Sequence, residues 1–176
     1  MRTITKNVYF FNELIHAAKE RARRDYETSG QQYAFADEAL ASIKALASHF
    51  NGEVGRHAVD WTGAYPSQMT FNMPEMNRTE IRERLRALGS YNRETLRGNG
   101  DCKLTGYCID EDAIDGFRIA FTSGESDLEA LMNAAFASWL QDAQSDAKYQ
   151  FSTEGYAEHC EGNGYEFYQD GRLLTD

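Results

Sequence analysis

Residues 127–148 read DLEALMNAAFASWLQDAQSDAK, and this stretch predicts the longest helix of the protein. Its large apolar side chains recur every three or four residues, which places them along one face of an α-helix. Ser126 and Glu129 stand three residues apart at its start, the spacing of a capping box. Because the apolar face is broad, we expect this helix to lie in the middle of the core. The face consists of Leu128, Leu131, Met132, Ala135, Phe136, Trp139 and Leu140.

The same periodicity predicts five more helices along the chain. Asn12 and Asp110 are expected as N-caps, because their side chains can accept hydrogen bonds from the free amides of a first helical turn. Asn77 and Glu80 form a second capping-box pattern. The five helices are expected at about residues 12–28, 34–50, 78–88, 110–121 and 153–161.

Alternation of apolar and polar residues predicts the strands. Strands are expected around residues 3–11, 59–61 and 69–73, and a hairpin is expected where residues 166–168 and 172–174 flank Asp170-Gly171. The chain therefore predicts an α+β protein, with a small, mainly antiparallel sheet of four or five strands packed against about five or six helices. No linker or repeat divides the sequence, so we expect a single domain over residues 1–176.

Charge is distributed unevenly along the 176 residues, which contain 28 acidic and 18 basic side chains. Residues 101–176 contain 16 acidic and four basic side chains, a formal charge of −12, whereas residues 1–100 carry +2. Net charge governs association and solubility more than fold. An acidic half of this size disfavours contact with nucleic acid and favours contact with proteins that hold nucleic acid.

The sequence indicates a soluble protein of the cytoplasm. No apolar run approaches the roughly 20 residues that cross a bilayer, and residues 1–6 lack the apolar region of a signal peptide. Three cysteines without framework spacing fit a reducing compartment.

No catalytic motif is found in the sequence. Residues 124–127, GESD, lack the glycine that follows the serine in a nucleophile elbow. The glycines of residues 98–100 and 162–164 do not lead into the Lys-Ser/Thr start of a phosphate-binding helix. We therefore predict neither enzymatic activity nor a cofactor.

Two patterns in the sequence partly match metal sites, but neither has the spacing that such a site needs. Cys102, Cys108, His159 and Cys160 have zinc-binding side chains, but the first two are too far apart for a zinc knuckle and the last two are adjacent. Residues 110–121 start like a calcium loop, yet the glycine falls at the seventh place and Phe121 at the twelfth. Buried thiols explain the cysteine pattern better. A helix N-terminus rich in acidic residues explains the pattern of residues 110–121 better.

The acidic side chains of the last two predicted helices form the leading candidate for a binding surface. Glu154, Glu158 and Glu161 follow the i, i+4, i+7 pattern of one helix face, and Asp142 and Asp146 are four residues apart. Like charges at this spacing are mildly destabilising, so local stability does not explain them. Tyr156 and Tyr165 are predicted as neighbouring aromatic anchors. The alternative explanation is an acidic surface that serves only solubility.

A cluster of arginines offers a second candidate surface. Arg78, Arg82, Arg86 and Arg93 lie within a short segment and could contact RNA or DNA. They could also meet the acidic face of a second copy in a homodimer. Glu80 and Glu83 among them and Glu94 just after them dilute the positive charge, which makes direct nucleic-acid binding the weaker interpretation.

Three stretches of the sequence support a family resemblance. They are residues 8–14, VYFFNEL, with 18–26; residues 104–108, LTGYC, with Asp110, Glu111 and Asp115; and residues 163–167, NGYEF, with 170–172. Together they cover about a third of the chain, and they resemble a family of small phage and prophage proteins often labelled as antitoxins of a toxin–antitoxin stability system. The resemblance implies an accessory protein of mobile elements, of the anti-CRISPR or anti-restriction type, and it brings no catalytic residues.

These observations together predict a phage-type inhibitor. Its acidic surface would occupy the nucleic-acid-binding channel of a bacterial defence complex or toxin, as a mimic of nucleic acid. The alternative is an accessory or antitoxin protein that binds nucleic acid through the arginine-rich helix of residues 78–97. No membrane contact is expected.

Overall fold

The computed structural model describes residues 7–29, 34–88, 104–105 and 109–175. The chain divides into two compact units: residues 1–34 with 147–176, here called the terminal unit, and residues 35–146, here called the central unit. The sequence predicts one domain, and no linker in it marks this division. Each unit has its own hydrophobic core.

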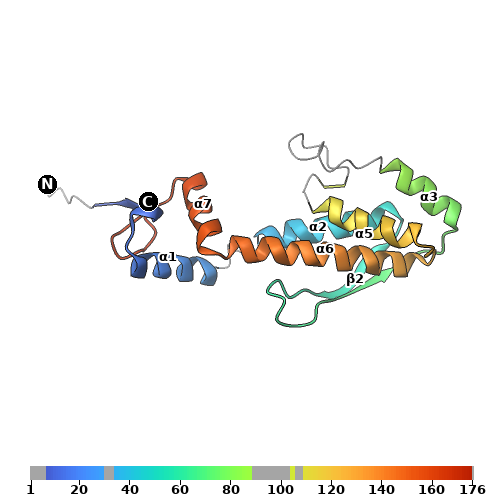
Figure 1. The fold of residues 1–176 in the computed structure, drawn as a ribbon, viewed down its shortest axis with the longest axis horizontal. Coiled ribbons are helices and arrows are strands. Elements are labelled where there is room, and N and C mark those ends of the chain that lie inside the picture. Colours follow the sequence, from blue (N-terminus) through green and yellow to red (C-terminus); the bar gives the residue numbers. More distant parts are fainter. Residues whose placement is uncertain (1–6, 30–33, 89–103, 106–108, 176) are drawn as a thin grey trace. The chain divides into compact units, whose positions relative to one another are not determined.

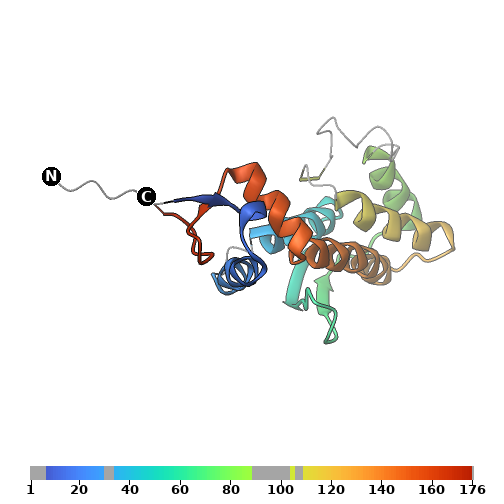
Figure 2. The ribbon, with the colours of Figure 1, turned by 60° about the vertical axis from the view of Figure 1, so that its left-hand side comes forward.

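The terminal unit joins the two ends of the chain. Strand β1 (Tyr9–Phe10) pairs antiparallel with β4 (Glu166–Phe167), and Phe167 also bridges to Leu173 beyond the turn. The expected hairpin is present, because the Tyr168 N–H donates to the Arg172 carbonyl at 2.9 Å. The two views of the ribbon show β1 and β4 next to each other, the first in blue and the second in red (Figures 1 and 2).

Two helices and a 3₁₀ turn complete the terminal unit. The 3₁₀ turn covers Phe11–Glu13, α1 covers His16–Thr28 and α7 covers Thr153–Asn163. Asn12 was expected to cap the first helix, but this was wrong, because the extended residues Leu14 and Ile15 separate the 3₁₀ turn from α1. Phe11, Ala18, Ala22, Tyr156 and Phe167 are among the residues that form the core of this unit.

The central unit is mainly helical. It contains α2 (Ala34–His49), α3 (Arg78–Ala87), α5 (Asp110–Thr122) and most of α6 (Leu128–Gln150). A hairpin of β2 (Glu53–Ala58) and β3 (Gln68–Asn72) joins α2 to α3 (Figure 1). The first strand lies earlier than expected, so that Val59 and Trp61 follow it and pack against the core.

Helix α6 provides the centre of that core, as its apolar face predicted. Leu131, Met132, Ala135 and Trp139 are fully buried. The indole N–H of Trp139 donates to the Ala39 carbonyl at 3.0 Å, which satisfies the one polar group of the ring. The helix therefore holds α2 in place both by packing and by a buried hydrogen bond.

Of the three helix caps predicted in the central unit, one is confirmed and two are wrong. The Asn77–Glu80 capping box is confirmed, since the Asn77 side chain accepts from the Thr79 and Glu80 amides. The Ser126–Glu129 box is wrong, because the Asp127 carboxylate accepts from the Ala130 amide at 2.8 Å instead. The Asp110 prediction is also wrong, since Ile109 holds the N-cap position of α5.

The α+β class is confirmed, but the strands do not form one sheet. Within the described residues, four strands form two separate antiparallel pairs beside six α-helices. One pair belongs to the terminal unit and the other to the central unit. None of the helices in the described ranges is both long and apolar enough to cross a membrane.

Candidate protein-binding surface

The predicted carboxylate row lies on the exposed face of α7. Ser152 caps this helix by accepting a hydrogen bond from the Gly155 N–H at 3.0 Å, and Gly164 ends it with a φ of +63°. Tyr156 and Cys160 face inward and are buried. Glu154, Glu158 and Glu161 are exposed on the opposite side, which confirms the helical face that their spacing predicted.

No basic side chain of the described ranges neutralises this row. Two of the arginines of α1 are paired elsewhere: Arg21 lies 3.1 Å from Asp170, and Arg23 lies 3.3 Å from Glu20 and also contacts Glu27. The ion pairs found among the described residues include neither Glu154, Glu158 nor Glu161. The row therefore keeps its negative charge available to a partner.

Tyr149, at the end of α6, interacts with the carboxylate row. Its hydrogen bond to Glu158, helped by the negative charge of Glu154, raises the pKa of the Tyr149 phenol above its usual value. The ring is 46% exposed. Tyr149 thus adds an accessible aromatic surface and a hydroxyl beside the acids, a contribution that was not predicted from the sequence.

Asp142 and Asp146 belong to the central unit and not to the unit that carries α7. Asp142 is half-buried and Asp146 is exposed. Desolvation, followed by the negative charge of Asp142, raises the pKa of Asp146 above its usual value. The five predicted acids are therefore divided between two units, and the surface described here is limited to the three on α7.

The two predicted tyrosine anchors have different positions. Tyr156 is only 4% exposed and packs edge-on against Phe11 at 5.0 Å between ring centres, so its assignment as a surface anchor is wrong. Burial also raises the pKa of its phenol. Tyr165 is half-buried and lines a pocket next to α7.

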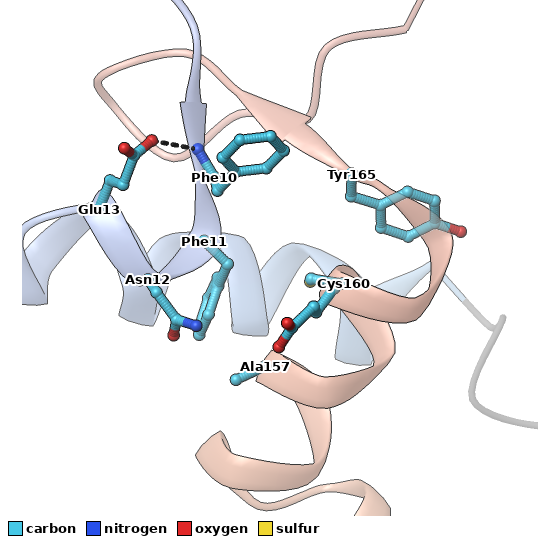
Figure 3. A pocket seen from close by; sticks show the side chains of 8 residues that line it. Phe10, Phe11, Asn12, Glu13, Ala157, Cys160 and Tyr165 are labelled. Carbon is cyan, nitrogen blue, oxygen red and sulfur yellow. Dashed lines mark hydrogen bonds between the residues drawn. The ribbon is translucent and has the colours of Figure 1, made fainter.

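This pocket has a volume of about 350 Å³ and lies within the terminal unit (Figure 3). One wall comes from the start of the chain and the other from α7 and the residue after Gly164. Phe10 is 56% exposed there, and the Phe10 N–H donates to the Glu13 carboxylate at 2.8 Å. Glu161 belongs both to the pocket and to the carboxylate row. The lining residues are Phe10, Phe11, Asn12, Glu13, Ala157, Cys160, Glu161 and Tyr165.

A signal for this pocket was present in the sequence. Residues 9–11 are three consecutive aromatic residues, and successive side chains of a strand point to opposite faces. They could not all enter the core, so one ring had to remain at the surface. The structure buries Phe11 and leaves Phe10 exposed.

Arg78 has a structural role, so its guanidinium is not available to the alternative arginine surface. Its guanidinium donates to the carbonyls of Phe121 at 2.7 Å and Glu125 at 2.8 Å, and it lies 4.3 Å from the centre of the Phe121 ring. Arg78 therefore fixes the start of α3 to the end of α5. Arg82 and Arg86 are exposed on α3, and Arg93 lies outside the described residues.

Among the predicted metal-site residues, Cys102 and Cys108 lie outside the described residues. Cys160 is buried, and this burial raises the pKa of its thiol to about 11. Asp110, the first residue of the calcium-loop pattern, is fully buried and accepts from the Thr105 amide and hydroxyl, both at 2.8 Å. In the ranges that the structure covers, no group of three or more potential ligands could hold a metal ion.

No family model, curated protein or solved structure matches this chain.

Proposed function

We propose that this protein is an inhibitor of the phage counter-defence type, and that it binds a basic, nucleic-acid-holding surface of a bacterial effector through α7. An anti-CRISPR role is the most concrete form of this proposal. The observation that supports it is the exposed row of Glu154, Glu158 and Glu161, which is free of ion pairs in the described part of the chain.

The geometry of the row suits a groove that normally holds nucleic acid. Side chains at i and i+4 stand about 5–6 Å apart on a helix, and phosphates along one strand rise by about 3.4 Å each. Lysines and arginines that line such a groove could therefore reach the carboxylates. Complementary charge would also speed association and make it sensitive to salt, because screening shortens the reach of the attraction.

Selective charge reversal tests this proposal. The variant E154K/E158K/E161K reverses the row, and E38K/E83K/E129K changes the net charge equally at exposed positions of the central unit. Each protein is used as bait in a bacterial lysate, and the captured complex is then tested for nucleic-acid binding by mobility shift. We expect the parent and the control to capture an effector and to displace its nucleic acid.

The α7 variant is expected to lose both capture and displacement while keeping its circular-dichroism spectrum. Equal capture by the parent and the α7 variant would refute the role of this helix. Capture without displacement would refute the mimicry of nucleic acid.

Direct nucleic-acid binding through α3 remains the second candidate. Arg82 and Arg86 are exposed and four residues apart, so they project from one side of the helix. A mobility shift with the isolated protein at low salt, lost in R82E/R86E, would favour this candidate over the inhibitor.

A further inference from the structure

The pocket beside the carboxylate row has the walls and the charge of a site for an organic cation. From these features we infer that it receives an arginine side chain of the basic partner, an inference that rests on the proposed function and names the chemistry that the partner must bring. Three aromatic rings, Phe10, Phe11 and Tyr165, line the pocket together with Glu13 (Figure 3). Glu161 also lines it.

The aromatic walls favour a flat cation. Aromatic faces attract cations through the ring quadrupole, and guanidinium also stacks on such faces. One of these rings already takes part in such an interaction: the Lys19 ammonium, which does not line the pocket, lies 5.8 Å from the centre of the Phe11 ring and donates to the Asn12 carbonyl at 3.0 Å. Phe10, with more than half of its surface exposed, offers a ring that a partner could cover.

The carboxylates decide the charge of the occupant. Glu161 is exposed and has no ion pair within the described residues. One oxygen of Glu13 accepts from the Phe10 N–H. An anion would be repelled by this pair, and a neutral apolar group would remove water from the carboxylates without replacing their hydrogen bonds. Arginine can stack on a ring and donate two parallel hydrogen bonds to one carboxylate.

Local structure holds the walls in place before any partner arrives. Phe10 is fixed by the pairing of β1 with β4, where it lies opposite Glu166. The Tyr165 N–H donates to the Cys160 carbonyl at 2.9 Å, directly after the left-handed Gly164. A preformed pocket loses less conformational entropy on binding.

Peptide titration with the full chain tests the inference. The probes are hexa-arginine and hexa-lysine peptides of equal charge, measured by isothermal titration calorimetry at low salt. We expect hexa-arginine to bind more tightly, and F10A and E161Q each to weaken it by about threefold to thirtyfold, the range that cation–π and charged hydrogen-bond contacts support. The controls are I15A, which removes another exposed apolar side chain of the terminal unit, and E83Q, on α3 of the central unit.

The outcomes separate this inference from the proposed function. If both peptides bind equally and F10A has no effect, the pocket does not select arginine and the inference is wrong. Loss of both peptides in E154K/E158K/E161K would still support the acidic surface in that case. If F10A removes the preference for arginine while E154K/E158K, which leaves the pocket residue Glu161 in place, captures the effector unchanged, the pocket is supported and the proposed role of the carboxylate row fails.

Discussion

Single residues of the terminal unit show how closely its backbone segments approach. Gly171 has a φ of +88°, and a Cβ atom there would lie 2.1 Å from the Ala18 carbonyl oxygen. The turn between β4 and Leu173 therefore lies directly on α1. Any side chain at this position would force the two segments apart, in addition to the strain of the left-handed backbone.

We predict that Gly171→Ala lowers the free energy of unfolding by about 1–3 kcal/mol, because both the backbone strain and the clash oppose folding. Urea denaturation followed by circular dichroism measures the change. Gly162→Ala is the matched control, since no atom lies within 4 Å of a Cβ at that position. Equal stability of the Gly171 variant and the parent would contradict the close approach.

At the scale of elements, α7 carries the proposed surface, and its start depends on one side chain. The Ser152 hydroxyl accepts from the Gly155 N–H, and this bond satisfies one of the amides that a helix start leaves free. Glu154 lies in the first turn, so fraying there would displace the first member of the carboxylate row. The cap thus links local stability to the order of the binding face.

Ser152→Ala is expected to lower the free energy of unfolding by about 1 kcal/mol, the usual effect of losing such a cap. Ser152→Asp should restore most of the loss, because aspartate caps as well as serine and its charge suits a helix N-terminus. Thermal unfolding and hydrogen exchange of the α7 amides measure both effects. An alanine variant with unchanged exchange at the start of α7 would show that the cap is dispensable.

At the scale of the whole molecule, the chain forms two units from three stretches. The central unit, residues 35–146, is inserted between the two segments that build the terminal unit. Its core is formed by its own helices and hairpin, with the rings of Phe50 and Phe117 stacked at 4.6 Å between centres. The terminal unit, by contrast, needs both ends of the chain at once.

We therefore predict that the fragment 35–146 folds by itself. It should unfold cooperatively, and the buried Trp139 should report this as a fluorescence change. A fragment of residues 1–34 alone should remain unfolded, because its apolar side chains pack against Tyr156, Cys160 and Phe167 from the other end of the chain. A non-cooperative transition of the central fragment would show that its core is incomplete without the termini.

The sequence alone was sufficient for features that depend on neighbouring residues. The apolar face of α6, the capping box at Asn77 and the turn at Asp170-Gly171 follow from contacts over a few positions, where periodicity and side-chain chemistry decide the outcome. The exposed row on α7 was predictable for the same reason, because helical spacing places its three acids on one side.

Tertiary structure decided which segments from distant parts of the chain meet. The pairing of β1 with β4, and the pocket between Phe10 and α7, depend on contacts between opposite ends of the sequence. Such contacts leave no local pattern. Long-range packing also placed Tyr156 in the core against Phe11. It likewise brought the Arg78 guanidinium into hydrogen bonds with carbonyls at and just after the end of α5. A side chain is removed from the surface when a distant partner buries it, and spacing along one helix does not contain that information.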